Sequence, residues 1–197
     1  MNNIHYASIR NLDISNGEGI GVALFVQGCH FHCYNCFNPD TWDFNGGKEW
    51  TPEVEDKFIE LANRPYIKRL SILGGEPLAD ENLDGVLHLV DRFRLSLPNK
   101  TIWLYTGYEV NLESYEILTI GKEYAKTRYE FTTTQPSRSN TANFLRKSIL
   151  NNVDVLVDGR YIDSQRDVNL KWRGSKNQRV IDIKQSLQKG KVTLWTE

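Results

Sequence analysis

Two kinds of apolar pattern alternate along the chain and predict strands separated by helices. Short continuous apolar runs are typical of strands buried in a parallel sheet. They predict strands at residues 21–27, 69–73, 101–105, 153–157 and 179–183, with a last one at 192–195. Apolar residues at helical spacing predict helices at 52–62, 82–97, 112–118 and 142–150, and a short one from about Gln185. The first helix has Thr51 as its N-cap and Pro52 in its first turn.

This alternation is typical of βαβ units with right-handed crossovers and a parallel sheet. A closed eight-fold barrel needs about 250 residues, and the chain has 197. We therefore expect one α/β domain over residues 1–197, an open partial barrel of mostly parallel strands. Ligands bind such sheets at the carboxyl ends of the strands.

Two stretches do not follow the alternation. Residues 1–20 are polar and rich in turn-forming residues, and we assign them a packing role. Residues from about 121 to 140 are polar and show no periodicity. We interpret the second stretch as a surface insertion of unknown role.

Composition narrows the class of protein. Hydrophobic residues make up 40% and charged residues 25%, as in ordinary soluble domains. A net charge of −1 offers no basic surface for nucleic acid. No apolar run approaches the roughly 20 residues that span a bilayer, and no export signal is visible at the N-terminus. We expect a cytoplasmic protein that has no nucleic-acid or membrane partner.

All three cysteines lie in one loop after the first predicted strand, as Cys29-x3-Cys33-x2-Cys36. Structural zinc sites and ordinary electron-transfer clusters take four protein ligands. Three thiolates on a 4Fe–4S cluster would leave one iron open to another ligand. A zinc site with His30 or His32 as fourth ligand is an alternative. A disulfide with one spare thiol is disfavoured by the odd number of cysteines.

The cysteine motif and Gly74-Gly75-Glu76-Pro77, which follows the second strand, resemble the radical S-adenosylmethionine (SAM) superfamily. Four further blocks resemble, more narrowly, the activating enzymes of anaerobic ribonucleoside-triphosphate reductase. They are Gln27-Gly28-Cys29, Asn38-Pro39-Asp40-Thr41-Trp42, Val155-Leu156-Val157-Asp158-Gly159 and Arg173-Gly174-Ser175-x-Asn177-Gln178-Arg179. The matching blocks extend from about residue 11 to residue 187.

The resemblance implies that Cys29, Cys33 and Cys36 hold a 4Fe–4S cluster and that SAM completes its open iron. Residues from each motif would contact SAM. They are Gly74, Gly75 and Glu76 at the methionine part, Arg160 at its carboxylate with Asp158 beside it, Thr106 at the adenosine, and Ser175 and Asn177.

Purely structural interpretations of these motifs stay open. The Gly74–Pro77 stretch could be only a strand-to-helix turn, Arg160 could form a surface ion pair, and residues 173–179 could be a charged surface loop. The family often carries an aromatic residue before its third cysteine, where this chain has Asn35. That difference leaves the contact with adenine undefined.

The resemblance also implies the activity. The reduced cluster would cleave SAM, and the resulting radical would take a hydrogen atom from a glycine of a large glycyl-radical reductase. A flavodoxin- or ferredoxin-like protein would donate the electron, and no residue need act as a general base. The alternatives are a small-molecule enzyme such as a deazapurine synthase, an activase of another glycyl-radical enzyme such as a formate lyase, and a non-catalytic electron-transfer or zinc-stabilised binding module.

Overall fold

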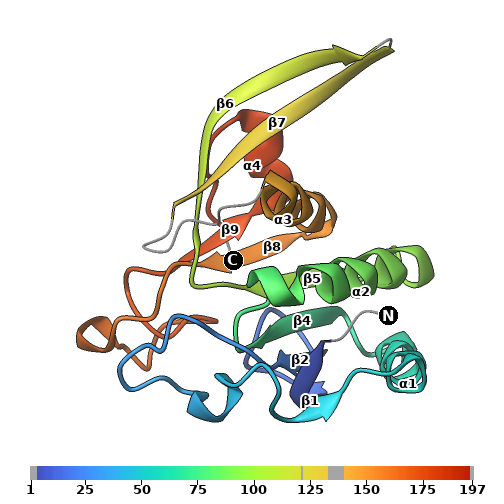
Figure 1. The fold of residues 1–197 in the computed structure, drawn as a ribbon, viewed down its shortest axis with the longest axis vertical. Coiled ribbons are helices and arrows are strands. Elements are labelled where there is room, and N and C mark those ends of the chain that lie inside the picture. Colours follow the sequence, from blue (N-terminus) through green and yellow to red (C-terminus); the bar gives the residue numbers. More distant parts are fainter. Residues whose placement is uncertain (1–3, 121, 133–139, 196–197) are drawn as a thin grey trace.

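The computed structural model describes residues 4–120, 122–132 and 140–195, and its centre is one seven-stranded sheet (Figure 1). The strand order is β3-β1-β2-β4-β5-β8-β9, so the sheet is open, with β3 and β9 at its edges. Its strands are β1 (His5–Asp13), β2 (Gly21–Val26), β3 (Lys48–Glu49), β4 (Arg69–Gly74), β5 (Thr101–Tyr105), β8 (Val155–Asp158) and β9 (Arg179–Asp182).

The four central strands form the parallel core that the apolar runs predict. Strands β2, β4, β5 and β8 are parallel neighbours in that order. The connections between them contain α1 (Pro52–Asn63), α2 (Leu83–Ser96) and α3 (Asn140–Asn152). Thr51 caps α1 by accepting a hydrogen bond from the Val54 amide at 3.4 Å. The α/β class and the open, mostly parallel sheet are confirmed.

The edges of the sheet differ from the sequence-based expectation. Residues 5–13, expected to be turn-rich, form β1, which pairs antiparallel with β2. Side chains of β1 such as Ser8, Arg10 and Leu12 are exposed, so this strand lacks the apolar run by which the buried strands are recognised. Strand β9 runs antiparallel to β8. Its N-terminal end therefore lies at the rim formed by the carboxyl ends of the central strands.

A hairpin separate from the main sheet follows β5. Strands β6 (Glu109–Ile120) and β7 (Lys122–Thr132) pair only with each other and extend away from the domain in Figure 1. The predicted helix at 112–118 is wrong, because short apolar stretches fit both periods. Of the expected insertion, residues 122–132 are β7, whereas 121 and 133–139 lie outside the described residues.

The C-terminal elements are shorter than the central ones. Helix α4 (Ile183–Lys189) begins two residues before Gln185. The predicted strand at 192–195 is reduced to a single bridge between Ile181 and Leu194. In the described part of the chain, no helix combines the length and apolar character needed to cross a membrane.

The two faces of the main sheet have different roles. Alternate side chains such as Val22, Leu24 and Ile72 join the large core beneath the helices. Their neighbours, such as Phe25 and Leu73, and the aromatic cluster around Trp103, lie on the opposite face. The helices therefore cover one face, and the other carries the walls of a cavity.

Candidate iron–sulfur and cofactor site

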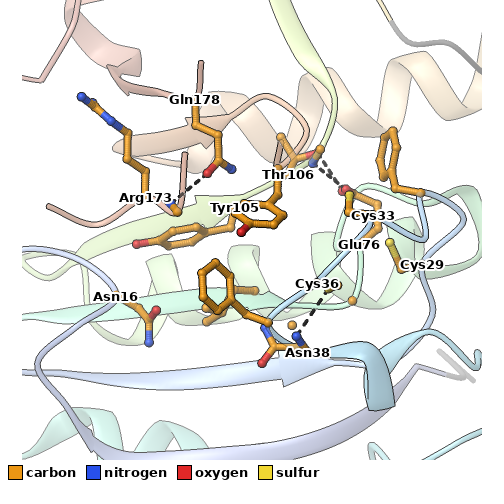
Figure 2. A pocket seen from close by; sticks show the side chains of 18 of the residues that line it. Asn16, Cys29, Cys33, Cys36, Asn38, Glu76, Tyr105, Thr106, Arg173 and Gln178 are labelled. Atoms are coloured by element: carbon orange, nitrogen blue, oxygen red, sulfur yellow. Dashed lines mark hydrogen bonds between the residues drawn. The ribbon is translucent and has the colours of Figure 1, made fainter. Parts of the chain in front are cut away.

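A cavity of about 400 Å³ opens at the carboxyl ends of the central strands (Figure 2). Four of its walls come from segments that the motifs identified. They are the cysteine loop after β2, the turn after β4, the end of β5 and the connection between β8 and β9. The predicted residues that line it are Cys29, Cys33, Cys36, Gly74, Gly75, Glu76 and Thr106.

Backbone hydrogen bonds fix the start of the cysteine loop. The Gly28 amide donates to the Thr41 carbonyl at 2.8 Å, and the Cys29 amide donates to that of Trp42 at 3.1 Å. The Gly28 carbonyl in turn accepts from the Glu76 amide at 2.7 Å. The loop is thus bound to its own C-terminal end and to the turn after β4 before any metal is considered.

The three thiols are free and half-buried. Burial raises the pKa of Cys29 to about 12, and the nearby Glu76 carboxylate contributes to the rise. A thiol of that pKa keeps its proton at neutral pH, so iron must displace the proton to bind. The Asn38 amide donates to the Cys36 sulfur at 3.4 Å, a contact that stabilises a thiolate.

The donor set fits a cluster better than a single metal ion. Among the described residues, no three His, Cys, Asp or Glu side chains are grouped so that they could hold one ion. A cubane cluster does not need several side chains around one ion, because each cysteine binds a different iron. His30 donates from Nε2 to the Glu81 carboxylate at 2.9 Å, and His32 stacks on Trp42 at 4.5 Å between ring centroids. Neither contact supports a zinc site.

Two glycines allow the turn after β4 to pack against the cysteine loop. Gly74 has a φ of 109°, a backbone angle that residues other than glycine rarely adopt. A Cβ on Gly75 would lie 2.4 Å from the Gly28 carbonyl oxygen. The glycines are therefore required by the chain's own packing, in addition to any approach of a cofactor.

Glu76 joins the turn after β4 to the loop after β5 at the cavity. Its carboxylate accepts hydrogen bonds from the Leu78 amide at 2.8 Å, and from the Thr106 hydroxyl and the Gly107 amide at 2.7 Å each. Only 2% of the residue is exposed. Burial raises the pKa of Glu76 to about 7, although the hydrogen bonds from Gly107, Thr106 and Leu78 oppose the rise. The main role of Thr106 at the site is to donate this hydrogen bond to Glu76.

Four predicted residues lie behind the wall of the cavity rather than in it. Asp158 is fully buried and accepts from Arg179 Nε at 2.9 Å and from the Val110 amide at 2.9 Å. Arg160 donates to the Phe31 carbonyl at 2.8 Å. Ser175 donates to Asn177 at 2.7 Å, and Asn177 donates to the Arg160 carbonyl at 2.8 Å. These contacts hold the β8–β9 connection together and bind it to the cysteine loop.

Other parts of the lining were not identified as site residues. Tyr105, Trp172, Arg173 and Gln178 line the cavity, as does Asn16 from the polar segment before β2. Arg173 and Gln178 belong to a recognised motif, but the motif does not show which of its members face inward. Tyr105 is adjacent to the predicted Thr106, and the rule that ligands bind at strand ends could have identified it.

The position before the third cysteine departs from the family pattern in geometry as well as in residue type. Asn35 has a φ of 52° and donates to the Asp163 carboxylate at 3.1 Å. Tyr34 is 78% exposed, so it does not substitute for an aromatic residue in the wall.

Comparison with known proteins assigns the family. A family model described as a 4Fe-4S single cluster domain matches residues 15–181. An anaerobic ribonucleoside-triphosphate reductase-activating protein of Vibrio cholerae is 37% identical over 177 residues, covering 89% of this chain and 96% of the relative. The chain belongs to this activating-protein family.

Other members of the activating-protein family show the same coverage. The protein of that name from Escherichia coli (strain K12) is 33% identical over 89% of this chain and 96% of its own length. The one from Enterobacteria phage T4 is 29% identical over 90% of this chain and 93% of its own. The region matched by the family model contains every predicted site residue. The match to a 4Fe-4S domain thus agrees with the structure, in which the three cysteines line one cavity.

Proposed function

We propose that this chain is a radical SAM enzyme that activates anaerobic ribonucleoside-triphosphate reductase by generating a glycyl radical on it. The family and its 4Fe–4S domain support the activity and the partner. The observation that carries the site assignment is the cavity, where three cysteines share one space with Gly74, Gly75 and Glu76.

In this proposal Cys29, Cys33 and Cys36 would hold the cluster, which would leave one of its irons without a protein ligand. The chain contains no fourth cysteine, so the open position is available to SAM. When bound, the cluster supplies the electron that cleaves SAM, and the radical chemistry ends on a glycine of the reductase.

The protein's part is to position and shield the reactants. Gly74 and Gly75, which line the cavity, would hold the methionine part of SAM, and Glu76 keeps their turn in place. Asp158, Arg160, Ser175 and Asn177 support the site from behind, through the β8–β9 connection. The fold in this proposal is a partial radical SAM barrel, the single domain covers residues 1–197, and the stretch around 121–140 is an insertion.

The open sheet suits a macromolecular substrate, because a closed barrel would exclude a loop of another protein. An external flavodoxin- or ferredoxin-like protein supplies the electron. The three reduced thiols support a cytoplasmic location. Nucleic acid and membranes are not partners in this proposal.

Anaerobic reconstitution with iron and sulfide tests the function. We expect an iron–sulfur absorption spectrum that changes when SAM is added. Incubation with the reductase, SAM and reductant should then give a glycyl doublet in electron paramagnetic resonance. A doublet that forms only with a formate lyase would reject the partner. Bound zinc and no response to SAM would reject the chemistry.

A further inference from the structure

The cavity wall contains a tyrosine whose hydroxyl lacks a partner. Tyr105, the last residue of β5, lines the cavity, and its hydroxyl oxygen is shielded from solvent. Among the described residues, no atom forms a hydrogen bond with that oxygen. Leaving a buried hydroxyl without a hydrogen-bond partner destabilises the folded protein. Such a group at the wall of a cavity indicates that something entering the cavity completes it.

The hydroxyl can act only as a neutral group. Burial raises the pKa of Tyr105 far above its ordinary value of 10.0, so the phenol keeps its proton at any physiological pH. The ring is held between the aromatic cluster of Trp103 and Trp172 and the side chains of Phe25 and Leu73. A fixed O–H donor of this kind selects an acceptor oxygen.

The charged groups that act on Tyr105 differ from those that act on Cys29. The ionisable groups that affect its pKa are Arg69 and Asp13, whereas Glu76 affects that of Cys29. Arg69 and Asp13 form a buried ion pair with a 2.7 Å contact. Tyr105 also packs against Phe25 and Leu73, in the same small cluster as Ala7 of β1.

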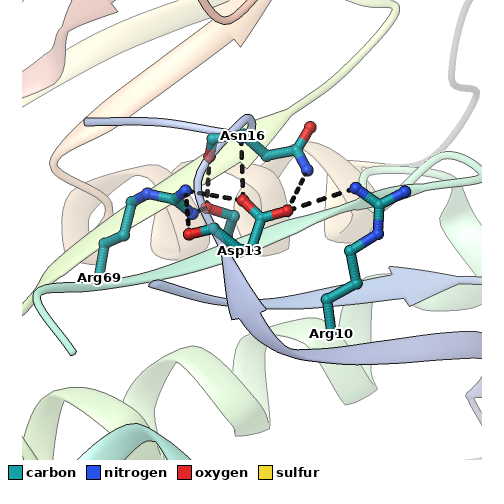
Figure 3. A network of polar contacts seen from close by, with 5 residues as sticks. Arg10, Asp13, Asn16 and Arg69 are labelled. Atoms are coloured by element: carbon teal, nitrogen blue, oxygen red, sulfur yellow. Dashed lines mark hydrogen bonds and ion pairs between the residues drawn. The ribbon is translucent and has the colours of Figure 1, made fainter. Parts of the chain in front are cut away.

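The same ion pair makes this part of the wall rigid (Figure 3). Asp13 accepts from the Asn16 amide at 2.9 Å and from its side-chain Nδ2 at 2.7 Å. The Asn16 carbonyl accepts from the Ser71 hydroxyl at 2.5 Å. Asn16, which also lines the cavity, is thus fixed through both its backbone and its side chain. A preformed wall loses little entropy when a flexible segment binds against it.

We propose that the Tyr105 hydroxyl donates a hydrogen bond to a backbone carbonyl of the reductase segment that carries the target glycine. This inference rests on the proposed function. A glycine has no side chain, so an enzyme that selects one must hold the peptide backbone around it. A neutral donor suits a peptide carbonyl and needs no counter-charge.

The Tyr105→Phe variant of the reconstituted enzyme tests this role, since it removes the hydroxyl and keeps the ring. The rate of glycyl-radical formation is measured against the concentration of full-length reductase and, separately, against that of SAM. We expect the KM for reductase to rise about fivefold, as for the loss of one neutral hydrogen bond, and by clearly more than the KM for SAM. The thermal midpoint should not fall, because the lost hydroxyl has no partner in the free protein.

Tyr66→Phe is the matched control, because Tyr66 is 47% exposed, does not line the cavity and has Arg64 over its ring. It should leave both KM values unchanged. Equal increases in the two KM values for Tyr105→Phe would make the hydroxyl a SAM ligand and overturn the proposal. Two unchanged KM values would overturn it as well. Failure of the wild-type enzyme to form any glycyl radical would instead reject the proposed function.

Discussion

At the scale of single residues, Glu76 links the turn after β4 to the loop after β5 through one buried carboxylate. Its pKa of about 7 lies above its ordinary value of 4.5, so the folded state binds a proton more tightly than the unfolded state does. Stability from this group is fully present below pH 4.5 and is lost as the pH rises through about 7.

This titration predicts a pH-dependent stability. The free energy of unfolding should contain a component that falls by about 3 kcal/mol between pH 4.5 and pH 7 and then levels off. Urea unfolding of the protein, kept in reductant, measures it. Glu76→Gln should lack this component, whereas Glu49→Gln, a change at an exposed position, should keep it. An identical pH profile in Glu76→Gln and the wild-type protein would contradict the assignment.

The cysteines provide a second residue-scale prediction. Cys29→Ala, Cys33→Ala and Cys36→Ala should each reduce SAM cleavage by more than about 100-fold, since even changes around metal ligands cost 10–100-fold. The thiols are only half-buried and lie in a loop, so the thermal midpoint should change little. Iron content and 5′-deoxyadenosine formation measure the effect.

The control for the cysteine variants is His30→Ala in the same loop. His30 pairs with Glu81, so its loss should leave the iron content unchanged. Loss of iron in that variant, or SAM turnover in any cysteine variant, would contradict the ligand assignment.

The sequence predicted cavity-lining residues better at the ends of β2, β4 and β5 than in the β8–β9 connection. The three cysteines, Gly74, Gly75, Glu76 and Thr106 all line the cavity. Asp158 does not, because alternate residues of a strand point to opposite faces and the motif contains both kinds. The neighbouring Gly159 lines the cavity instead. A motif identifies a segment, but the direction of each side chain depends on register.

At the scale of elements, the β8–β9 connection supports the cysteine loop across a gap in sequence. Arg160 donates to the Phe31 carbonyl, Asp163 accepts from Asn35, and the ring of Tyr161 packs against that of Phe37 at 5.0 Å. Each contact joins this connection to the loop that carries the cysteines. We therefore expect the connection to help retain the proposed cluster without supplying a ligand.

Arg160→Ala tests this support. Losing one hydrogen bond of about 1 kcal/mol should release iron to a chelator about fivefold faster, with little change in the KM for SAM. Lys176→Ala in the same connection is the control, since the Lys176 side chain is exposed and its ion pair is with Asp167, within the connection. An increased KM for SAM at normal iron retention would show instead that Arg160 binds the SAM carboxylate.

The elements that the sequence predicted well are those with two buried faces. Strands β2, β4, β5 and β8 appear as continuous apolar runs, because helices cover one face and aromatic side chains cover the other. Exposed side chains interrupt β1, so it shows no such run and was missed. The hairpin was missed because the short apolar stretch at 112–118 fits a helix as well as a strand. The antiparallel direction of β9 was missed too, since an apolar run carries no information about direction.

At the scale of the whole molecule, the chain consists of the open sheet with its helices and a hairpin outside that sheet. The sheet, the cavity and every proposed ligand belong to the first part. The hairpin begins next to Val110, whose amide donates to Asp158 and whose carbonyl accepts from Arg179. Those bonds anchor its base, and the strands beyond the base pair only with each other.

Shortening the hairpin should therefore leave the chemistry intact. Asn111 and Glu130 are paired in the β6–β7 register, so joining them through Asn-Gly forms a two-residue turn without disturbing the anchored base. We expect SAM cleavage in the absence of reductase to stay within about twofold of the wild-type rate, because isolated two-stranded hairpins add little stability. Loss of iron binding or a collapse of the thermal midpoint would show that the hairpin is part of the fold. A domain that keeps its cluster and its turnover would instead confine the activity to the open sheet.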